Sequence, residues 1–240
     1  RIMIDKMVGK TEVALYGLAY SIGMLVQLFI SGMNSALTPW MYSKIKKGDI
    51  RSMRKVLQLL SIVVVGIAVA LMLISPELVL IFGSPKYREA VYVIPPVAAS
   101  VFFIFIYNIL SMPQFYYEKT QFLMAASMAA AGANVVLNFI FIRLFGYIAA
   151  GYTTLACYML YSVGHYIVSK RILVNEGIQE NLMNPGFLLA CSVFLIGASI
   201  ICNLIFPYRI LRYAILLASA GLVFWKKELL LKTMADIRKK

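Results

Sequence analysis

The sequence predicts an all-α fold, a polytopic bundle of helices that crosses a membrane several times. Hydrophobic residues make up 62% of the 240 residues, and the mean hydropathy is +0.83, whereas soluble globular domains are roughly 45–50% apolar. The apolar residues also form runs of about 17–25 residues, the length that a helix needs to cross a bilayer. Because a soluble core could not bury this excess of apolar surface, a soluble domain is excluded.

Seven apolar segments are expected to be membrane spans. Each span must be helical, because the backbone polar groups find no water inside the hydrocarbon layer. The third segment carries prolines that predict either a broken helix lining a cavity or an ordinary kink. The fourth contains a run of small residues at 125–133, which predicts a close helix–helix interface. The segments are 13–37, 56–82, 91–115, 122–142, 147–168, 186–206 and 213–225.

Lysine and arginine are distributed unevenly between the two sides of the predicted bundle. Of the 23 such residues, fifteen fall on the side that holds the loop at 44–55 and the C-terminal tail, and eight fall on the other side. Cytoplasmic loops carry an excess of these residues, so we expect that side and the C-terminus to be cytoplasmic. The net charge of +13 lies in short blocks between apolar runs. That distribution favours membrane lipids as partners over nucleic acid.

The chain carries no motif of an enzyme or a metal site. Cys157, Cys191 and Cys202 all lie inside apolar runs, and no CxxC or Cys/His cluster is present. A phosphate-binding loop, a nucleophile elbow and paired carboxylates on a soluble loop are also absent from the sequence. We therefore expect no catalytic residue, no metal and no cofactor. The chain starts at Arg1 without an initiator methionine or a signal peptide pattern, so we expect an amino-terminal part to be missing.

A sparse set of polar residues forms the candidate substrate path. Ionisable groups are costly at membrane depth, and here they cluster at helix ends, where snorkelling to the lipid headgroups is the alternative role. The neutral amides either face a cavity or hydrogen-bond a neighbouring helix. The sole histidine, His165, is expected at the membrane interface, with a role in proton coupling as the alternative. The candidates are Arg1, Asp5, Lys6, Gln27, Asn34, Asn108, Tyr116, Tyr117, Glu118, Lys119, Asn134, Asn138 and Arg143.

Two stretches of this set have a pattern of their own. Asn134 and Asn138 are four residues apart and therefore share one helix face. Tyr116 to Lys119 lie in the run QFYYEKT, which is dense in hydrogen-bonding and aromatic groups. The alternative to a functional role for this run is an aromatic belt with a topogenic lysine.

Three passages in the first 151 residues resemble, in the same order, the carboxy-terminal half of polysaccharide flippases. This family lies in the superfamily of multidrug, oligosaccharidyl-lipid and polysaccharide exporters. The chain departs from the family pattern at Arg143, where proline is usual, and at Ala149, where glycine is common. The passages are RIMIDKMVG at 1–9 with VALYGLAY at 13–20, SPE at 75–77 with FG at 82–83 and YREA at 87–90, and NVVLN at 134–138 with FGYIAAG at 145–151.

The resemblance implies one lobe of a two-lobed, V-shaped transporter with extra helices. Residues 1–170 would form the second lobe (the end of one helix plus five spans), 171–185 a cytoplasmic connector, and 186–240 an additional helix pair with a basic cytoplasmic tail. The implied substrate is an undecaprenyl-diphosphate-linked oligosaccharide, which such proteins move across the bacterial cytoplasmic membrane by rocking the lobes about a central cavity. A polysaccharide polymerase or glycosyltransferases are the implied protein partners.

The substrate's charge makes a specific prediction about the cavity. A diphosphate that crosses a layer of low dielectric constant needs cations, so we expect Arg1, Lys6 and Lys119 to line the path. Two alternatives stay open: a cation-coupled multidrug exporter of the same superfamily, and a non-transporting membrane scaffold of a polysaccharide-assembly complex. The sequence shows no intramembrane acid suited to sodium or proton coupling, which favours the flippase over the drug exporter.

Overall fold

The computed structural model describes residues 1–225, and in that range the chain is helical with no strand. The prediction of an all-α polytopic bundle is confirmed. The basic tail expected at 226–240 lies outside the described residues. The elements are α1 (Ile2–Met7), α2 (Lys10–Gly23), α3 (Leu25–Lys46), α4 (Ile50–Phe82), the 3-10 helix η1 (Pro85–Val93), α5 (Ile94–Tyr116), α6 (Gln121–Phe145), α7 (Ala149–Asn175), α8 (Pro185–Ile205) and α9 (Arg209–Trp225).

Within residues 1–225, five helical stretches are long and apolar enough to cross a membrane: Lys10–Lys46, Ile50–Phe82, Pro85–Tyr116, Gln121–Phe145 and Pro185–Ile205. Two of the seven expected spans are not among them. α7 has 27 residues, but tyrosine, threonine, serine and histidine interrupt its apolar residues. α9 is described over 17 residues, and the residues that follow it lie outside the described part of the chain. Membrane spans at 147–168 and 213–225 stay predictions.

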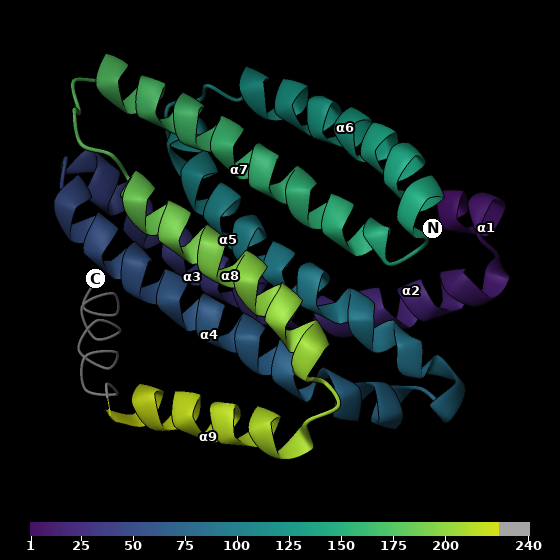
Figure 1. Cartoon of the computed structure of the whole chain (residues 1–240). Coiled ribbons are helices and arrows are strands. Elements are labelled where there is room, and N and C mark those ends of the chain that lie inside the picture. The colour runs from purple at the N-terminus through teal and green to yellow at the C-terminus, as the bar shows by residue number, and fades with distance from the viewer. Residues whose placement is uncertain (226–240) are drawn as a thin grey trace.

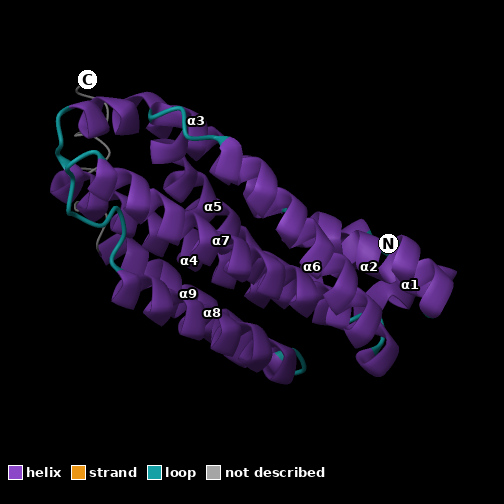
Figure 2. Cartoon of the chain, turned by 90° about the horizontal axis from the view of Figure 1, so that it is seen from above, coloured by secondary structure: helices purple, strands orange, loops and turns teal. Residues whose placement is uncertain are grey.

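α5 is the central helix of the bundle. Of its most apolar window, 89% is buried by other parts of the chain, and it packs against α2, α3, α4, α7 and α8. A helix that is hydrophobic all round needs such a position. α6 is the opposite case, because only 6% of its window is buried. Figure 1 shows α6 and α7 along one edge of the molecule and α9 along the opposite edge, beside α4. Figure 2 shows most of the loops at the two ends of the helices.

The prolines expected to break the third span do not break it. Pro95 and Pro96 lie in the first turn of α5, directly after η1, where a backbone N–H has no helical partner in any case. Pro113 lies in the last turn. α5 therefore runs without interruption from Ile94 to Tyr116, and the expected break does not occur in it.

The break lies instead in the first predicted span. α2 ends at Gly23, Met24 joins it to α3, and Gly23 is buried against Val97 of α5. A Cβ atom at Gly23 would lie 2.7 Å from the Cγ1 atom of Val97. Because a β-branched valine in a helix has one strongly preferred rotamer, it has little freedom to move aside. Glycine is required here for the close approach of two helices.

Substitution of Gly23 by alanine is therefore expected to lower the free energy of unfolding by about 1–3 kcal/mol through overpacking. The matched control is Gly32→Ala in α3, where an added Cβ meets no atom within 4 Å. Alanine at that position improves helix propensity. Thermal unfolding in detergent, followed by loss of the monodisperse peak, measures both variants. Equal midpoints for the two would contradict the packing argument.

Candidate functional site

Five tyrosines from three helices line one cavity of about 620 Å³. Tyr16 and Tyr20 lie one turn apart on α2, Tyr107 is on α5, and Tyr158 and Tyr161 lie three residues apart on α7. Side chains three or four residues apart share a helix face, so each helix presents its tyrosines on one side. We call this cavity the tyrosine groove.

The tyrosine rings of the groove contact one another. The rings of Tyr107 and Tyr158 are nearly parallel, at an interplanar angle of 3° and 6.3 Å between centroids. Tyr161 meets Tyr107 edge-on at 4.7 Å, and Tyr16 stacks on Tyr20 at 5.9 Å. Such aromatic pairs contribute about 0.5–1.5 kcal/mol each beyond the area that they bury. The wall formed by α5 and α7 is therefore held by ring contacts between the two helices.

A second cavity of about 500 Å³ continues the tyrosine groove toward α1 and α6. The two cavities share Arg1, Tyr16, Asn134 and Thr154 in their walls. The guanidinium carbon of Arg1 lies 5.7 Å from the centre of the Tyr20 ring. Among the residues that line either cavity, Arg1 carries a charge and no aspartate or glutamate occurs. The continuous groove is therefore polar, aromatic and cationic at one position.

Asn134 and Asn138 of α6 form the hydrogen-bonded edge of this groove. Asn138 donates from Nδ2 to the backbone carbonyl of Asn134 at 2.9 Å and to its Oδ1 at 2.8 Å. Thr153 of α7 donates to Asn138 Oδ1 at 2.7 Å. Both alternatives for this pair are thus realised, since the two amides connect α6 to α7 and also line a cavity.

The remaining charged candidates lie outside the groove. Asp5 and Lys6 are exposed on α1. Arg143 is exposed near the end of α6, with its guanidinium 4.0 Å from the centre of the Phe139 ring. Glu118 and Lys119 are exposed in the turn after α5, where Glu118 has a φ of 56°. Of the three cations expected to line the path, the structure places Arg1 alone at the groove, and roles for Lys6 and Lys119 stay predictions.

The remaining uncharged candidates also lie outside the groove. Gln27 and Asn34 are half-buried on α3, and their side-chain oxygens have no hydrogen-bond partner among residues 1–225. Asn108 is half-buried on α5. The Tyr116 and Tyr117 rings meet edge-on at 4.9 Å between centroids. These residues belong to other parts of the bundle, and a substrate role for them stays a prediction.

The small residues of α6 face α7 across a cavity of about 430 Å³. Ala130 and Ala131 additionally line the tyrosine groove. The small side chains leave space between α6 and α7 at this stretch, although the two helices pack along each other and Ser127 is hydrogen-bonded to Tyr161. The alanines that line this cavity are Ala125, Ala126, Ala129, Ala130 and Ala133.

Sequence reasoning did not single out the five groove tyrosines. The spacings of Tyr16 to Tyr20 and of Tyr158 to Tyr161 were available signals, because each pair shares a face. No signal along the chain joins Tyr107 to the α7 pair, since that contact is made only by folding.

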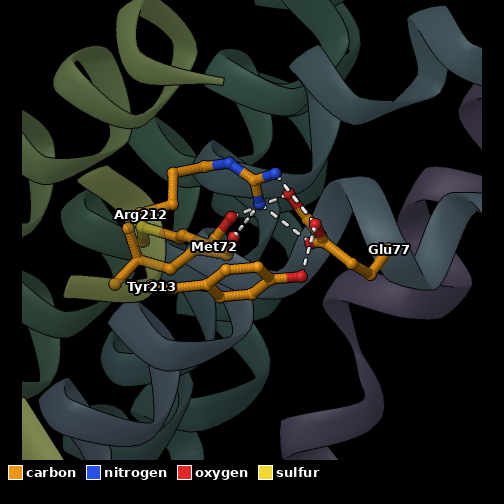
Figure 3. A network of polar contacts seen from close by, with 6 residues as sticks. Met72, Glu77, Arg212 and Tyr213 are labelled. Carbon is orange, nitrogen blue, oxygen red and sulfur yellow. Dashed lines mark hydrogen bonds and ion pairs between the residues drawn. The ribbon is translucent and has the colours of Figure 1, made fainter. Parts of the chain in front are cut away.

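Sequence reasoning also missed a buried ion pair that holds α9 to α4. Arg212 is 3% exposed and donates to both carboxylate oxygens of Glu77, at 2.8 Å each. It also donates to the backbone carbonyl of Leu73 at 2.6 Å, and the Tyr213 hydroxyl donates to Glu77 at 3.0 Å. Figure 3 shows the guanidinium and the phenol directed at the same carboxylate. A helix-end role by snorkelling was expected for Glu77, and an ion pair with a distant helix replaces it.

Comparison with known proteins gives one match. A family model described as MatE matches residues 1–140, from α1 into α6. No curated protein and no solved structure matches the chain. The matched region holds Arg1, Tyr16, Tyr20, Tyr107 and Asn134 of the groove, whereas the α7 tyrosines lie beyond it.

Proposed function

The chain belongs to the MatE family, within the superfamily of multidrug, oligosaccharidyl-lipid and polysaccharide exporters, and from this premise we propose that it translocates a lipid-linked oligosaccharide. The family makes it a membrane transporter. The proposed substrate is an undecaprenyl-diphosphate-linked repeat unit of a bacterial polysaccharide. The proposed membrane is the bacterial cytoplasmic membrane, with the C-terminus in the cytoplasm.

The composition of the groove carries this proposal. Tyrosine rings offer flat apolar faces for the C–H faces of sugar rings, and tyrosine, asparagine and threonine offer donors and acceptors for sugar hydroxyls. Arg1 presents a planar guanidinium, the group best suited to bidentate binding of phosphate. One groove thus holds the two chemistries that a sugar diphosphate requires.

The same composition disfavours the drug exporter as the alternative. Many exported drugs are cations. A cavity that binds them needs a carboxylate, or aromatic rings without a competing positive charge beside them. The described walls of the groove hold no aspartate or glutamate, and Arg1 would repel a cation. A scaffold without transport would not need a polar groove between helices, although polymerase or glycosyltransferase partners are compatible with the flippase as well.

Arg1→Gln is expected to reduce polysaccharide export about tenfold in a flippase-null strain complemented with the full protein. The variant removes a charge-assisted contact of about 1.5–3 kcal/mol, and 1.4 kcal/mol corresponds to a factor of ten. The matched control is Lys86→Gln, which removes an exposed charge from η1 outside the groove. Surface polysaccharide and protein amount are measured in parallel.

The same strains separate the alternatives. Unchanged export by Arg1→Gln at a normal protein amount would contradict the proposed role of the groove. Resistance to cationic drugs without restored export would favour the drug exporter. Recovery of glycosyltransferases in a pull-down, again without export, would favour the scaffold.

A further inference from the structure

His165 lies in the seam between α5 and α7, near the C-terminal end of α5, and its side chain is fully buried. Its Nδ1 atom is 2.8 Å from Nε2 of Gln114 on α5, whose side chain is also fully buried. Other side chains of the bundle enclose the ring, and its expected position at the membrane interface stays a prediction. The polar pair of Gln114 and His165 therefore lies inside the contact of α5 with α7, the most extensive helix–helix contact among the described residues.

Three polar atoms at this seam have no hydrogen-bond partner among residues 1–225. They are Oε1 of Gln114, Nε2 of His165 and Oγ of Ser169, which is 1% exposed and one turn beyond His165 on α7. An unsatisfied buried polar group costs about 1–3 kcal/mol. An apolar seam would avoid that penalty, so the cluster calls for an explanation beyond packing.

The histidine ring lies directly behind the wall of the tyrosine groove. Tyr161 meets it edge-on at 4.5 Å between centroids, and Tyr107 lies at 5.8 Å. Phe122 of α6 closes the third side at 5.7 Å. Tyr107 and Tyr161 also line the groove. A change in the environment of His165 therefore acts on two of the five groove tyrosines by direct contact.

The groups that face the ring determine its charge. α5 contributes Tyr107 and Gln114, α6 contributes Phe122, and α7 contributes Tyr161. The ion pairs of the described chain do not include His165. Because an isolated charge is strongly disfavoured in a buried site, the ring is neutral in this arrangement, and Nδ1 accepts a hydrogen bond from Nε2 of the Gln114 amide.

We propose that His165 is a proton-binding site whose protonation opens the α5–α7 seam and with it the tyrosine groove. When the ring takes up a proton, both nitrogens become donors, so the donating amide nitrogen of Gln114 must turn away. The new charge has no counter-charge at the seam and is stabilised by water. Neutral His165 therefore favours the closed seam, and protonated His165 at acid pH favours the open seam. Opening of the seam in turn favours protonation of His165. This inference concerns the chain alone and does not depend on the identity of the substrate.

Cys157 provides a reporter for the test. Its thiol lines the tyrosine groove and is 7% exposed. With every other cysteine of the full protein replaced by serine, Cys191 and Cys202 included, the protein in detergent is alkylated with a small maleimide between pH 5.5 and 8. Each rate is divided by the rate for the unfolded protein at the same pH, which removes the intrinsic pH dependence of the thiol. We expect the corrected rate to rise by about tenfold or more toward acid pH. A rise of tenfold corresponds to a difference of about one unit between the pKa of His165 in the open seam and its pKa in the closed seam.

Two variants and a second reporter complete the design. His165→Gln removes the titrating group and should make the corrected rate independent of pH. Gln114→Glu supplies a counter-charge inside the closed seam and should also abolish the rise. Cys191 on α8, used as the single thiol in place of Cys157, should show no rise, because it does not line the groove. An equal rise in the His165→Gln protein, or a rise at Cys191, would overturn the proposal.

A measurement without a variant at His165 covers the case in which His165→Gln does not fold. His165 is the sole histidine of the 240 residues, and once any other histidine of the full protein is replaced, its carbon-13 Cε1 resonance reports one titration. Its midpoint should coincide with that of the Cys157 alkylation profile. Midpoints more than one pH unit apart, or a resonance that does not titrate while alkylation rises, would refute the coupling. Neither experiment involves transport, so its outcome is independent of the flippase assignment.

Discussion

Replacement of Arg212 by methionine is expected to lower the free energy of unfolding by about 3 kcal/mol. The substitution removes two charge-assisted hydrogen bonds and leaves the partly buried Glu77 carboxylate without its cation. It also removes the contact to the Leu73 carbonyl that joins the start of α9 to α4. Loss of the monodisperse peak on heating in detergent measures the effect.

The double variant Glu77→Met with Arg212→Met is the decisive comparison for this ion pair. Removal of both charges leaves no unpaired charge, although the Tyr213 hydroxyl loses its acceptor, so most of the lost stability should return. Arg51→Met is the matched control, because Arg51 is an exposed arginine on α4, the helix that carries Glu77, and it should not change the unfolding midpoint. An Arg212→Met protein as stable as the unsubstituted one would show that the pair does not hold α9.

Replacement of Tyr107 by alanine is expected to reduce export about tenfold at an unchanged protein amount. Tyr107 contacts both α7 tyrosines of the groove, so the variant removes one flat face for a sugar ring and also the ring contacts that position Tyr158 and Tyr161. A loss of 1.4 kcal/mol corresponds to a factor of ten. The measurement is surface polysaccharide in the complemented flippase-null strain, with membrane protein quantified in the same cells.

Tyr107→Phe separates the ring from its hydroxyl. It keeps both ring contacts, so most of the export should remain if stacking is the main contribution. Equal, severe losses in the alanine and phenylalanine variants would assign the effect to the hydroxyl instead. Full export by the alanine variant would exclude the ring from the substrate path.

The fold followed from the sequence to the extent that it depends on local composition. The span expected at 186–206 is observed as α8 (Pro185–Ile205), because run length and the proline at its start are properties of the segment itself. The break at Met24 could not be predicted, since it depends on the contact of Gly23 with Val97 on another helix. α7 was expected as a span, and its polar residues serve contacts within the bundle, as His165 and Thr153 illustrate.

The candidate site was less predictable than the fold. The spacing of Asn134 and Asn138 correctly predicted a shared helix face. The sequence also indicated Arg1 as a cation of the path, and Arg1 lies at the groove. The ion pair of Arg212 with Glu77 joins positions 135 residues apart, and hydropathy contains no information about such a partner. The burial of His165 was missed for the same reason, because Gln114 and the surrounding rings come from other segments.

The most direct test of lipid-linked oligosaccharide translocation uses the purified full protein in liposomes. A fluorescent polyprenyl-diphosphate oligosaccharide is placed in both leaflets, and the fraction accessible to an external glycosidase is followed with time. The account predicts that accessibility rises from about half to nearly all of the substrate, and that Arg1→Gln slows this rise. Accessibility that stays at the value of protein-free liposomes, while the same vesicles accumulate a cationic dye, would contradict it.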